Sequence, residues 1–166
     1  MWCCKRLCLA AALSLALVLS ACGYNFSATA PIVLPQEMNT LHLGDVTDPT
    51  TEAWLESTFR SHIRDEFTRR GDVSWKSAQR ADGQLRVEIF SFSSAGKLET
   101  AEEVTVRSEI TMRFRGRIFD LPDQSLVWES QDIGVSVTYS EDRQHAEQRA
   151  VRRAAEKLAD QLSRQF

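Results

Sequence analysis

Cysteine is scarce in this sequence and confined to its start. The 166 residues include four cysteines, namely Cys3, Cys4, Cys8 and Cys22. The first three lie in residues 1–21, a segment that we expect to be removed for reasons given below, so the mature chain keeps only Cys22. No disulfide can then form within that chain. We therefore expect the fold to depend on its apolar core alone, even in an oxidising compartment.

Residues that usually carry catalysis are also few. The histidines His42, His62 and His145 are scattered, and no serine lies in a Gly-x-Ser-x-Gly turn. His62 and Glu66 are four residues apart on an expected helix, but no third metal ligand is near, so a surface hydrogen bond is the favoured interpretation. Zinc-binding cysteines and the glycines of a phosphate loop are absent from the mature sequence. The sequence therefore predicts a protein that is not an enzyme and that has no metal.

No excess of positive charge marks the chain. Without Lys5 and Arg6, which lie in the segment expected to be removed, the basic residues fall from 20 to 18 against 23 acidic ones, a net charge of −5. A mildly acidic total argues against a general nucleic-acid binder. The sequence also shows no second transmembrane run and no internal repeat.

The N-terminal stretch has the pattern of a bacterial secretory signal with a lipobox. The basic pair Lys5-Arg6 precedes an almost uninterrupted apolar run from Leu7 to Leu19, and Leu19-Ser20-Ala21-Cys22 follows at once. The apolar run is shorter than the ~20 residues of a membrane-spanning helix. The pattern predicts cleavage directly before the cysteine.

The residue left at the mature terminus is the expected site of lipid attachment. In lipoproteins of this pattern the thiol corresponding to that of Cys22 carries a diacylglycerol, and the freed amine carries a further N-acyl chain. Several acyl chains, at ~0.8 kcal/mol per buried methylene, hold a protein on a membrane essentially permanently. Gly23 at the next position, in place of an aspartate, resembles lipoproteins that are passed on to the outer membrane.

The mature chain has the length of one compact domain preceded by a linker. Residues 22–39 contain Pro31 and Pro35 and little periodicity, so we expect a lipidated N-terminus with an extended tether. Residues 40–166 are expected to form the domain.

The first part of the domain is predicted to be a strand followed by a helix and a short strand. Leucines alternate with other residues over 41–44, which indicates the first strand. Asp48 and Pro49 predict the helix start, and Gly71 after it predicts a left-handed C′ residue. The apolar stripe of this helix recurs every four residues at Leu55, Phe59, Ile63 and Phe67. Val73 and Trp75 permit the short strand.

The middle of the domain reads as two long strands. Apolar and polar residues alternate over 83–93, and residues 94–102 are polar and predicted to be a hairpin loop. The clearest alternation in the chain, over 104–118, predicts a long strand with one buried face.

The end of the domain is predicted to be a returning strand and a closing helix. The strand covers 126–139, and its apolar parity shifts midway, which favours a bulge near 130–132. Ser140 is the expected cap of the last helix. The inward stripe of that helix is Ala150, Val151, Ala154, Ala155, Leu158 and Leu162.

Together these elements predict an α+β fold. The expected architecture is a two-layer sandwich in which a mixed sheet of four to five strands carries two helices on one face. The opposite face of the sheet would be polar and open.

Several motifs follow one another in an order that is characteristic of one protein family. They are Cys22-Gly23-Tyr24-Asn25-Phe26 at the mature terminus, Glu66-Phe67-Thr68-Arg69-Arg70-Gly71 at the end of the first helix, Ala81-Asp82 before a strand, the long alternating strand, and Leu126-Val127-Trp128-Glu129 after a turn. This succession resembles the LPS-assembly lipoprotein family LptE over nearly the whole mature chain. The turn at 121–125 departs from the Thr-Gly that the family often has, which affects turn geometry more than function.

The resemblance implies a fold, a place and a set of partners. The fold is a two-layer α+β domain, and the place is the outer membrane, with the lipid-anchored domain facing the periplasm or the lumen of a barrel. The implied function is that of a plug and assembly partner of the LptD β-barrel, which helps deliver lipopolysaccharide to the outer leaflet. A different outer-membrane lipoprotein that assists a secretin or a cell-wall synthase shares the anchor, the tether and the lack of catalytic residues, so this alternative stays open.

Arginines on one strand face are the candidate binding residues. They are Arg107, Arg113, Arg115 and Arg117, joined by Arg86 from the neighbouring strand. Alternate strand residues are ~7 Å apart, so the guanidinium groups would form a row. Guanidinium binds phosphate in bidentate fashion, and lipid A and the inner core of lipopolysaccharide supply phosphates. We hypothesise that this row contacts lipopolysaccharide. The alternative is a solvated face whose charges pair with Glu88, Glu109 or the acidic residues 99–103.

Overall fold

The computed structural model describes residues 31–35, 38–71, 73–98 and 106–165, with residues 96–98 and 106–107 described by their backbone alone. The expected signal peptide, Cys22 and most of the expected tether therefore lie outside the described residues. The elements in chain order are β1 (Thr40–Thr47), α2 (Leu55–Arg70), β2 (Ser74–Trp75), β3 (Gly83–Leu98), β4 (Val106–Asp120), β5 (Leu126–Glu129), β6 (Ile133–Tyr139) and α3 (Arg143–Ser163).

The sheet is mixed and has six strands in the described part of the chain. Its order is β2-β1-β3-β4-β5, and β6 also pairs with β4. Strand β1 runs parallel to β2 and β3, while β4 is antiparallel to β3, β5 and β6. The predicted α+β class is thus confirmed, but the predicted count of four to five strands is too low.

The extra strand arises where the sequence predicted a bulge. The stretch expected to be one strand is interrupted between Glu129 and Ile133, and its two parts pair with different parts of β4. Ser130 occupies the break: its N–H donates to the Gly116 carbonyl (2.9 Å), and its hydroxyl accepts from the Gly116 N–H (2.9 Å). The break in the strand would otherwise leave these backbone groups without partners, and the two bonds satisfy them.

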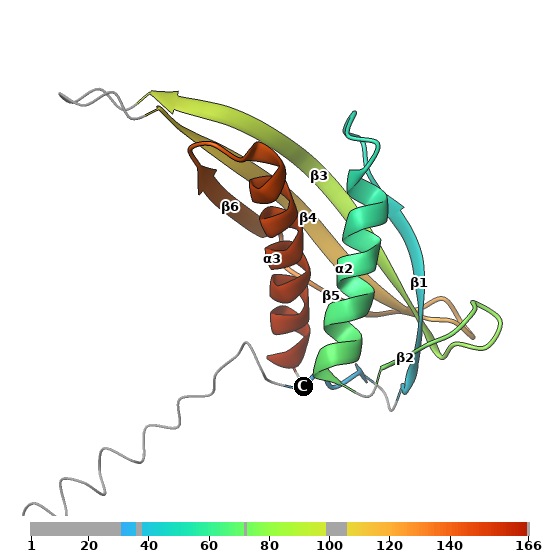
Figure 1. Ribbon diagram of the computed structural model, residues 1–166. Coiled ribbons are helices and arrows are strands. Elements are labelled where there is room, and N and C mark those ends of the chain that lie inside the picture. Colours follow the sequence, from blue (N-terminus) through green and yellow to red (C-terminus); the bar gives the residue numbers. More distant parts are fainter. Residues whose placement is uncertain (1–30, 36–37, 72, 99–105, 166) are drawn as a thin grey trace, which may run out of the picture.

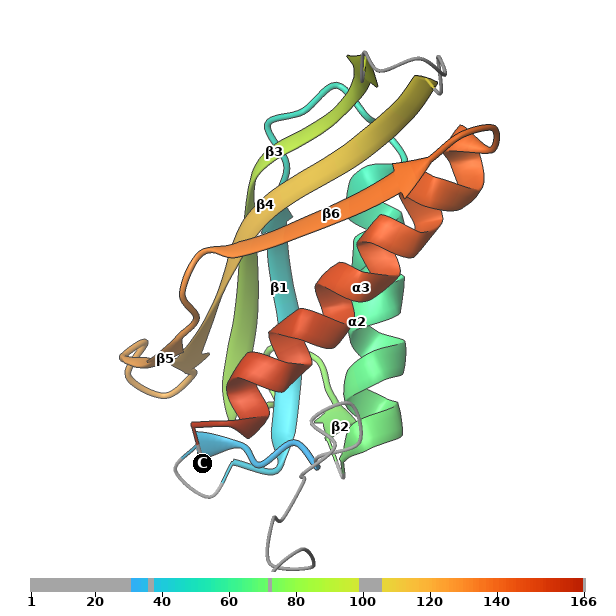
Figure 2. The ribbon, with the colours of Figure 1, turned by 90° about the vertical axis from the view of Figure 1, so that its left-hand side faces the viewer.

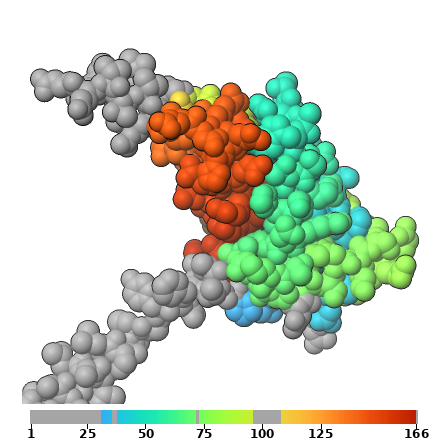
Figure 3. All heavy atoms as spheres, viewed as in Figure 1, coloured from blue at the N-terminus to red at the C-terminus, as the bar shows by residue number. Residues whose placement is uncertain are grey.

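Both helices cover the same face of the sheet, as predicted (Figures 1 and 2). They lie side by side, and the space-filling view shows them forming one continuous surface (Figure 3). The predicted stripe of α2 is fully buried, with Leu55, Phe59, Ile63 and Phe67 all at 0% exposure. The predicted stripe of α3 is buried as well, and it is extended by Ala146 and Ala159. None of the helices in the described ranges is long and apolar enough to cross a membrane.

A glycine in β4 allows α3 to approach the sheet closely. A β-carbon on Gly116 would lie 2.6 Å from Cδ1 of Leu158, which is closer than packed carbon atoms can come. The small alanines of α3 act in the same direction. At this contact α3 therefore packs closely against β4.

A buried ion cluster joins the ends of the two helices. The Arg70 guanidinium donates to Glu66 of its own helix and to Asp160 of α3, and its side chain is 2% exposed. Burial alone would lower the pKa of Arg70, but the hydrogen bonds to Asp160 and Glu66 outweigh that effect and raise the pKa. Arg69 also binds Glu66 (2.7 Å), from a position that is 56% exposed. The cluster fastens α2 to α3 at one end of the layer.

The helix ends differ from the sequence predictions. Helix α2 begins at Leu55, because Asp48 instead accepts from the Thr50 N–H (2.9 Å) in a preceding turn. Gly71 has φ −157° and ψ 173°, so it is extended and does not take the left-handed conformation. The cap of α3 is Asp142, which accepts from the N–H of His145 (2.8 Å), and not Ser140.

Strand β3 is longer than predicted. The residues from Ser94 onward, expected to be a loop, continue to pair with β4 as far as Leu98 opposite Val106. Small polar residues resemble a loop in composition, but a long partner strand supplies their backbone hydrogen bonds. Residues 99–105, which include the rest of the predicted loop, lie outside the described residues.

Two connections tie the N-terminal part of the domain to its sheet. Ile32 and Met38, from the segment expected to be a tether, are each 7% exposed and join the core. At the start of β1, Asp82 accepts hydrogen bonds from the backbone N–H of Asn39 (3.0 Å) and from the N–H and hydroxyl of Thr40 (2.9 and 2.8 Å). The Thr40 hydroxyl bond, followed by the backbone bonds, lowers the pKa of Asp82. The aspartate of the Ala81-Asp82 motif is therefore a structural residue.

Candidate anion-binding face

The sheet face opposite the helices, called the outer face below, carries the predicted arginines of β4. Apolar and charged residues alternate along β4 as the sequence predicted. Met112, Phe114 and the other inward residues are buried, while the arginines between them point away from the helices. The exposed fractions of the arginine side chains are 63% for Arg113, 31% for Arg115 and 33% for Arg117. Three guanidinium groups thus lie in a row on one strand.

Two arginines of this row are held by carboxylates from three sides. Arg117 donates to Glu88 of β3 (3.2 Å) and to Glu129 of β5 (2.7 Å). Arg115 donates to Asp132 (2.6 and 2.9 Å) and to Glu129 (3.4 Å). The hydrogen bond from Arg117 lowers the pKa of Glu129, and the hydrogen bond to Asp132 raises the pKa of Arg115. These arginines are therefore oriented, and their charge is largely balanced.

The third arginine of the row is looser. Arg113 lies 3.7 Å from Asp132 and is the most exposed of the three. Arg107 is paired with Lys97 in the backbone ladder, but its side chain lies outside the described part, so its predicted role stays a prediction. The same holds for Cys22, the expected lipidation site.

Of the three carboxylate partners, the sequence indicated only Glu88, and only within the alternative in which the charges of this face are paired. Glu129 and Asp132 were not predicted. The β4–β5 ladder places Glu129 directly opposite Arg117, and the break before β6 carries Asp132 to Arg115. Counting the antiparallel register back from the turn would have placed Trp128 opposite Arg117, because the ladder shifts between Ile118 and Phe119.

Arg86 differs from the arginines of β4 because neutral groups hold it. Its Nε and Nη2 donate to Gln84 Oε1 (2.9 and 2.7 Å), and Nη2 also donates to Gln124 Oε1 (3.1 Å). Its guanidinium lies over the Phe119 ring, 4.6 Å from the centroid, in cation–π geometry. Gln124 is the one non-glycine residue with positive φ (59°) in the described chain, and its turn conformation brings this amide to Arg86. Within the described residues no carboxylate neutralises Arg86.

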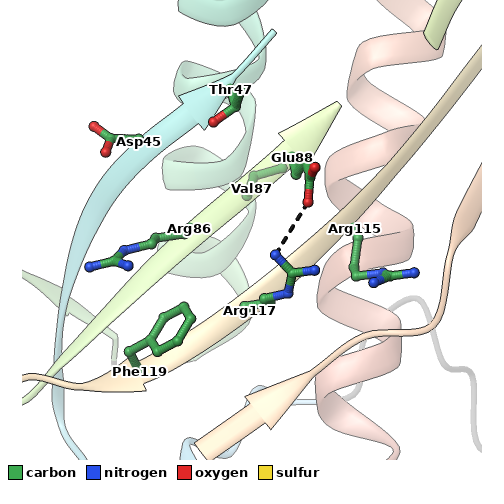
Figure 4. A pocket seen from close by; sticks show the side chains of 8 residues that line it. All are labelled: Asp45, Thr47, Arg86, Val87, Glu88, Arg115, Arg117 and Phe119. Atoms are coloured by element: carbon green, nitrogen blue, oxygen red, sulfur yellow. Dashed lines mark hydrogen bonds and ion pairs between the residues drawn. The ribbon is translucent and has the colours of Figure 1, made fainter. Parts of the chain in front are cut away.

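A hollow of about 310 Å³ opens on the outer face between β1, β3 and β4 (Figure 4). Its lining consists of Asp45, Thr47, Arg86, Val87, Glu88, Arg115, Arg117 and Phe119. Arg86 lies directly opposite Arg117 in the sheet register, but Figure 4 shows their side chains pointing to opposite sides, that of Arg86 toward Phe119 and that of Arg117 toward Glu88 and Arg115. A guanidinium group held on a rigid sheet can bind a phosphate group in bidentate fashion.

The described ranges contain no group of three or more His, Cys, Asp or Glu side chains that could hold a metal ion. The Nδ1 atom of His42 lies 3.2 Å from the Lys76 carbonyl oxygen, which gives this histidine a hydrogen-bonding role at the sheet edge.

The protein is thus a two-layer α+β domain in which two helices cover one face of the sheet, while the outer face is charged and contains a hollow. A model of the family LptE, described as lipopolysaccharide-assembly, matches residues 38–166. The chain therefore belongs to the LptE family, which confirms the resemblance seen in its motifs.

Solved structures share this fold at low sequence identity. A protein from Xanthomonas campestris is similar with a TM-score of 0.53 and 15% identity, covering 80% of this chain and 83% of that one. A hypothetical protein from Chlamydia trachomatis is similar with a TM-score of 0.51 and 13% identity, covering 75% of this chain and 97% of that one. No match was found among curated proteins. At such identities the likeness concerns the fold alone.

Proposed function

We propose that this protein is an outer-membrane lipoprotein that acts as plug and assembly partner of an LptD-like β-barrel and helps deliver lipopolysaccharide to the outer leaflet. The family match over residues 38–166 carries this proposal. The lipobox before Cys22 supports acylation with a diacylglycerol and an N-acyl chain, and Gly23 supports sorting to the outer membrane. The domain would then face the periplasm or the barrel lumen.

The protein would work by binding and positioning, without catalysis. Its family serves lipopolysaccharide assembly, and its outer face offers oriented guanidinium groups to a phosphate-bearing glycolipid. Arg86 supports this role best, because neutral amides and an aromatic ring hold it in place without balancing its charge.

The carboxylates around Arg113, Arg115 and Arg117 do not prevent this role. Partly exposed ion pairs of this kind contribute only ~0–1 kcal/mol each. A phosphate, with three acceptor oxygens, can therefore compete for the same guanidinium groups. The arginine row, with Arg107 as a further candidate at its end, would bind lipopolysaccharide through such exchange.

Depletion of the protein in its host tests the assembly function. We expect surface lipopolysaccharide to fall and lipopolysaccharide to accumulate behind the outer membrane, and we expect the tagged protein to copurify with an outer-membrane barrel. Normal lipopolysaccharide export, with no barrel in the pull-down, would contradict the proposal. Copurification of a secretin or a cell-wall synthase would instead support the alternative lipoprotein role.

A triple variant tests the outer face. Replacing Arg113, Arg115 and Arg117 by serine should weaken lipopolysaccharide binding by the purified protein several-fold. The matched control removes three exposed arginines from the opposite layer, R152S/R153S/R164S, and should bind as the wild type does. Equal binding by both triple variants and the wild type would exclude the row as the binding surface.

A further inference from the structure

The hollow on the outer face contains two opposite charges that are not paired with each other. Asp45, on β1, and Arg86, on β3, both line it (Figure 4). Neither forms an ion pair with any residue in the described part of the chain. Every other charged residue of the lining, namely Glu88, Arg115 and Arg117, is engaged in an ion pair.

The strand register places these two charges side by side. Pairing in the parallel β1–β3 ladder shifts between Leu43 and Val46, where β1 has a bulge. This bulge places Gly44 and Asp45 together opposite Arg86. Neighbouring strands are ~4.8 Å apart. The two side chains do not meet because Arg86 is turned toward the amides of Gln84 and Gln124 and lies on the Phe119 ring.

A donor group remains available on the cationic side of the hollow. The Nη1 amine of Arg86 makes no hydrogen bond with a described residue, since Nε and Nη2 make those to the two glutamines. Arg117 is instead engaged by Glu88 and Glu129 and points away from Arg86. Arg86 is therefore the residue of the hollow that suits a phosphate oxygen.

The anionic side disfavours a simple phosphate. A phosphate held by Arg86 would lie near the Asp45 carboxylate, and like charges at such separations repel. A ligand that carries an ammonium group beside its phosphate would convert this repulsion into an attraction. A two-carbon spacer between phosphate and amine has a length similar to the strand spacing.

We propose that the hollow between β1, β3 and β4 binds an aminoethyl phosphate group, with the phosphate on Arg86 and the ammonium group on Asp45. This inference rests on the proposed function, because it names the headgroup chemistry that the outer face selects. Two envelope lipids can supply this chemistry: a lipopolysaccharide decorated with phosphoethanolamine, and phosphatidylethanolamine.

Matched small ligands test the selectivity. The full purified chain in non-ionic detergent is titrated with O-phosphoethanolamine and with glycerol 1-phosphate, which lacks the amine, and binding is followed by calorimetry. We expect the wild type to bind O-phosphoethanolamine about tenfold more tightly, which corresponds to the removal of one favourable charge contact. Equal affinities, or no binding of either ligand, would overturn the proposal.

Two variants separate the roles of the two charges. Asp45→Asn should abolish the preference by weakening O-phosphoethanolamine alone, whereas Arg86→Gln should weaken both ligands. If Asp45 served only to position Arg86, Asp45→Asn would weaken both ligands equally, and the proposal would fail. Arg152→Gln, on the exposed side of α3, is the control and should leave both affinities unchanged. Far-UV circular dichroism confirms that each variant is folded.

A last comparison identifies the source of the group. Binding of the wild type and of Asp45→Asn is measured to vesicles of phosphatidylethanolamine and to micelles of lipopolysaccharide with or without phosphoethanolamine. Asp45-dependent binding to either amine-bearing lipid supports the proposal and names its ligand, and its absence from both refutes it. If the aminoethyl phosphate proposal is wrong but the assembly function is right, depletion of the protein should still impair lipopolysaccharide export. The two failures can therefore be distinguished.

Discussion

Arg70 and Arg69 offer a direct test of how burial changes the value of an ion pair. Both arginines bind Glu66, but the Arg70 side chain is 2% exposed and the Arg69 side chain is 56% exposed. Replacing Arg70 by methionine leaves Asp160 without its helix-to-helix partner and leaves Glu66 with Arg69 alone. Loss of one partner of a buried pair costs about 3–5 kcal/mol. Since Asp160 is 23% exposed and Glu66 keeps one arginine, we expect the lower end, about 3 kcal/mol.

The matched substitution Arg69→Met should cost less than about 1 kcal/mol, because its pair is largely solvated. For a domain of this size 1 kcal/mol corresponds to roughly 4 °C in Tm, so we expect falls of about 12 °C for Arg70→Met and under about 4 °C for Arg69→Met. Thermal unfolding followed by far-UV circular dichroism measures both. The double variant Arg70→Met/Asp160→Asn should be no less stable than Arg70→Met, because the orphaned carboxylate is gone. Equal Tm values for the two single variants would refute the reasoning.

Three further predictions concern the packing of the domain and the Asp82 bonds. Asp82→Asn should destabilise by about 1–2 kcal/mol at pH 7. Folding lowers the pKa of Asp82, so the stability that its carboxylate contributes is present above the unfolded pKa of about 3.9 and is lost as the pH falls through the folded value. Urea titrations of the wild type and the variant should therefore converge only in that acid range. Gly116→Val should destabilise the domain by about 1–3 kcal/mol, because its side chain would clash with Leu158. Gly134→Val is the control and should be close to neutral, because a β-carbon there meets nothing within 4 Å. Equal Tm values for these two variants would show that α3 can shift to relieve the clash. Phe114→Ala should cost about 3–5 kcal/mol, because this ring is fully buried and lies edge-on to Phe59 at 5.0 Å, while Leu126→Ala at 51% exposure should change the midpoint of unfolding little.

Periodic features of the chain were predictable from sequence. The stripe from Leu55 to Phe67 and the alternation around Arg113 to Arg117 both appear in the structure on the expected faces. Each depends on the fixed geometry of one element, so a short window of sequence is sufficient to recognise it. The order of the motifs was also sufficient to indicate the family, which the match over residues 38–166 confirms.

Element ends were less predictable, because tertiary contacts compete with local signals there. Asp48 has the chemistry of a helix cap but bonds within its own turn, and the chain runs extended through Gly71 beside Ile32. Ser94 has the composition of a loop, yet β4 extends far enough to pair with it. In each case a more distant part of the chain decided the conformation.

The sequence by itself determined the expected export signal, the two-layer pattern and the presence of arginines on one strand face. Only the tertiary structure decided which carboxylates those arginines meet, that Arg86 is held by neutral groups, and that Asp45 lies beside it. The physical reason is that amphipathic period is a property of neighbouring residues, whereas contacts between strands depend on register. That register is set by the β1 bulge, the turn before β5 and the break before β6, and a shift of one residue would exchange every partner on the outer face.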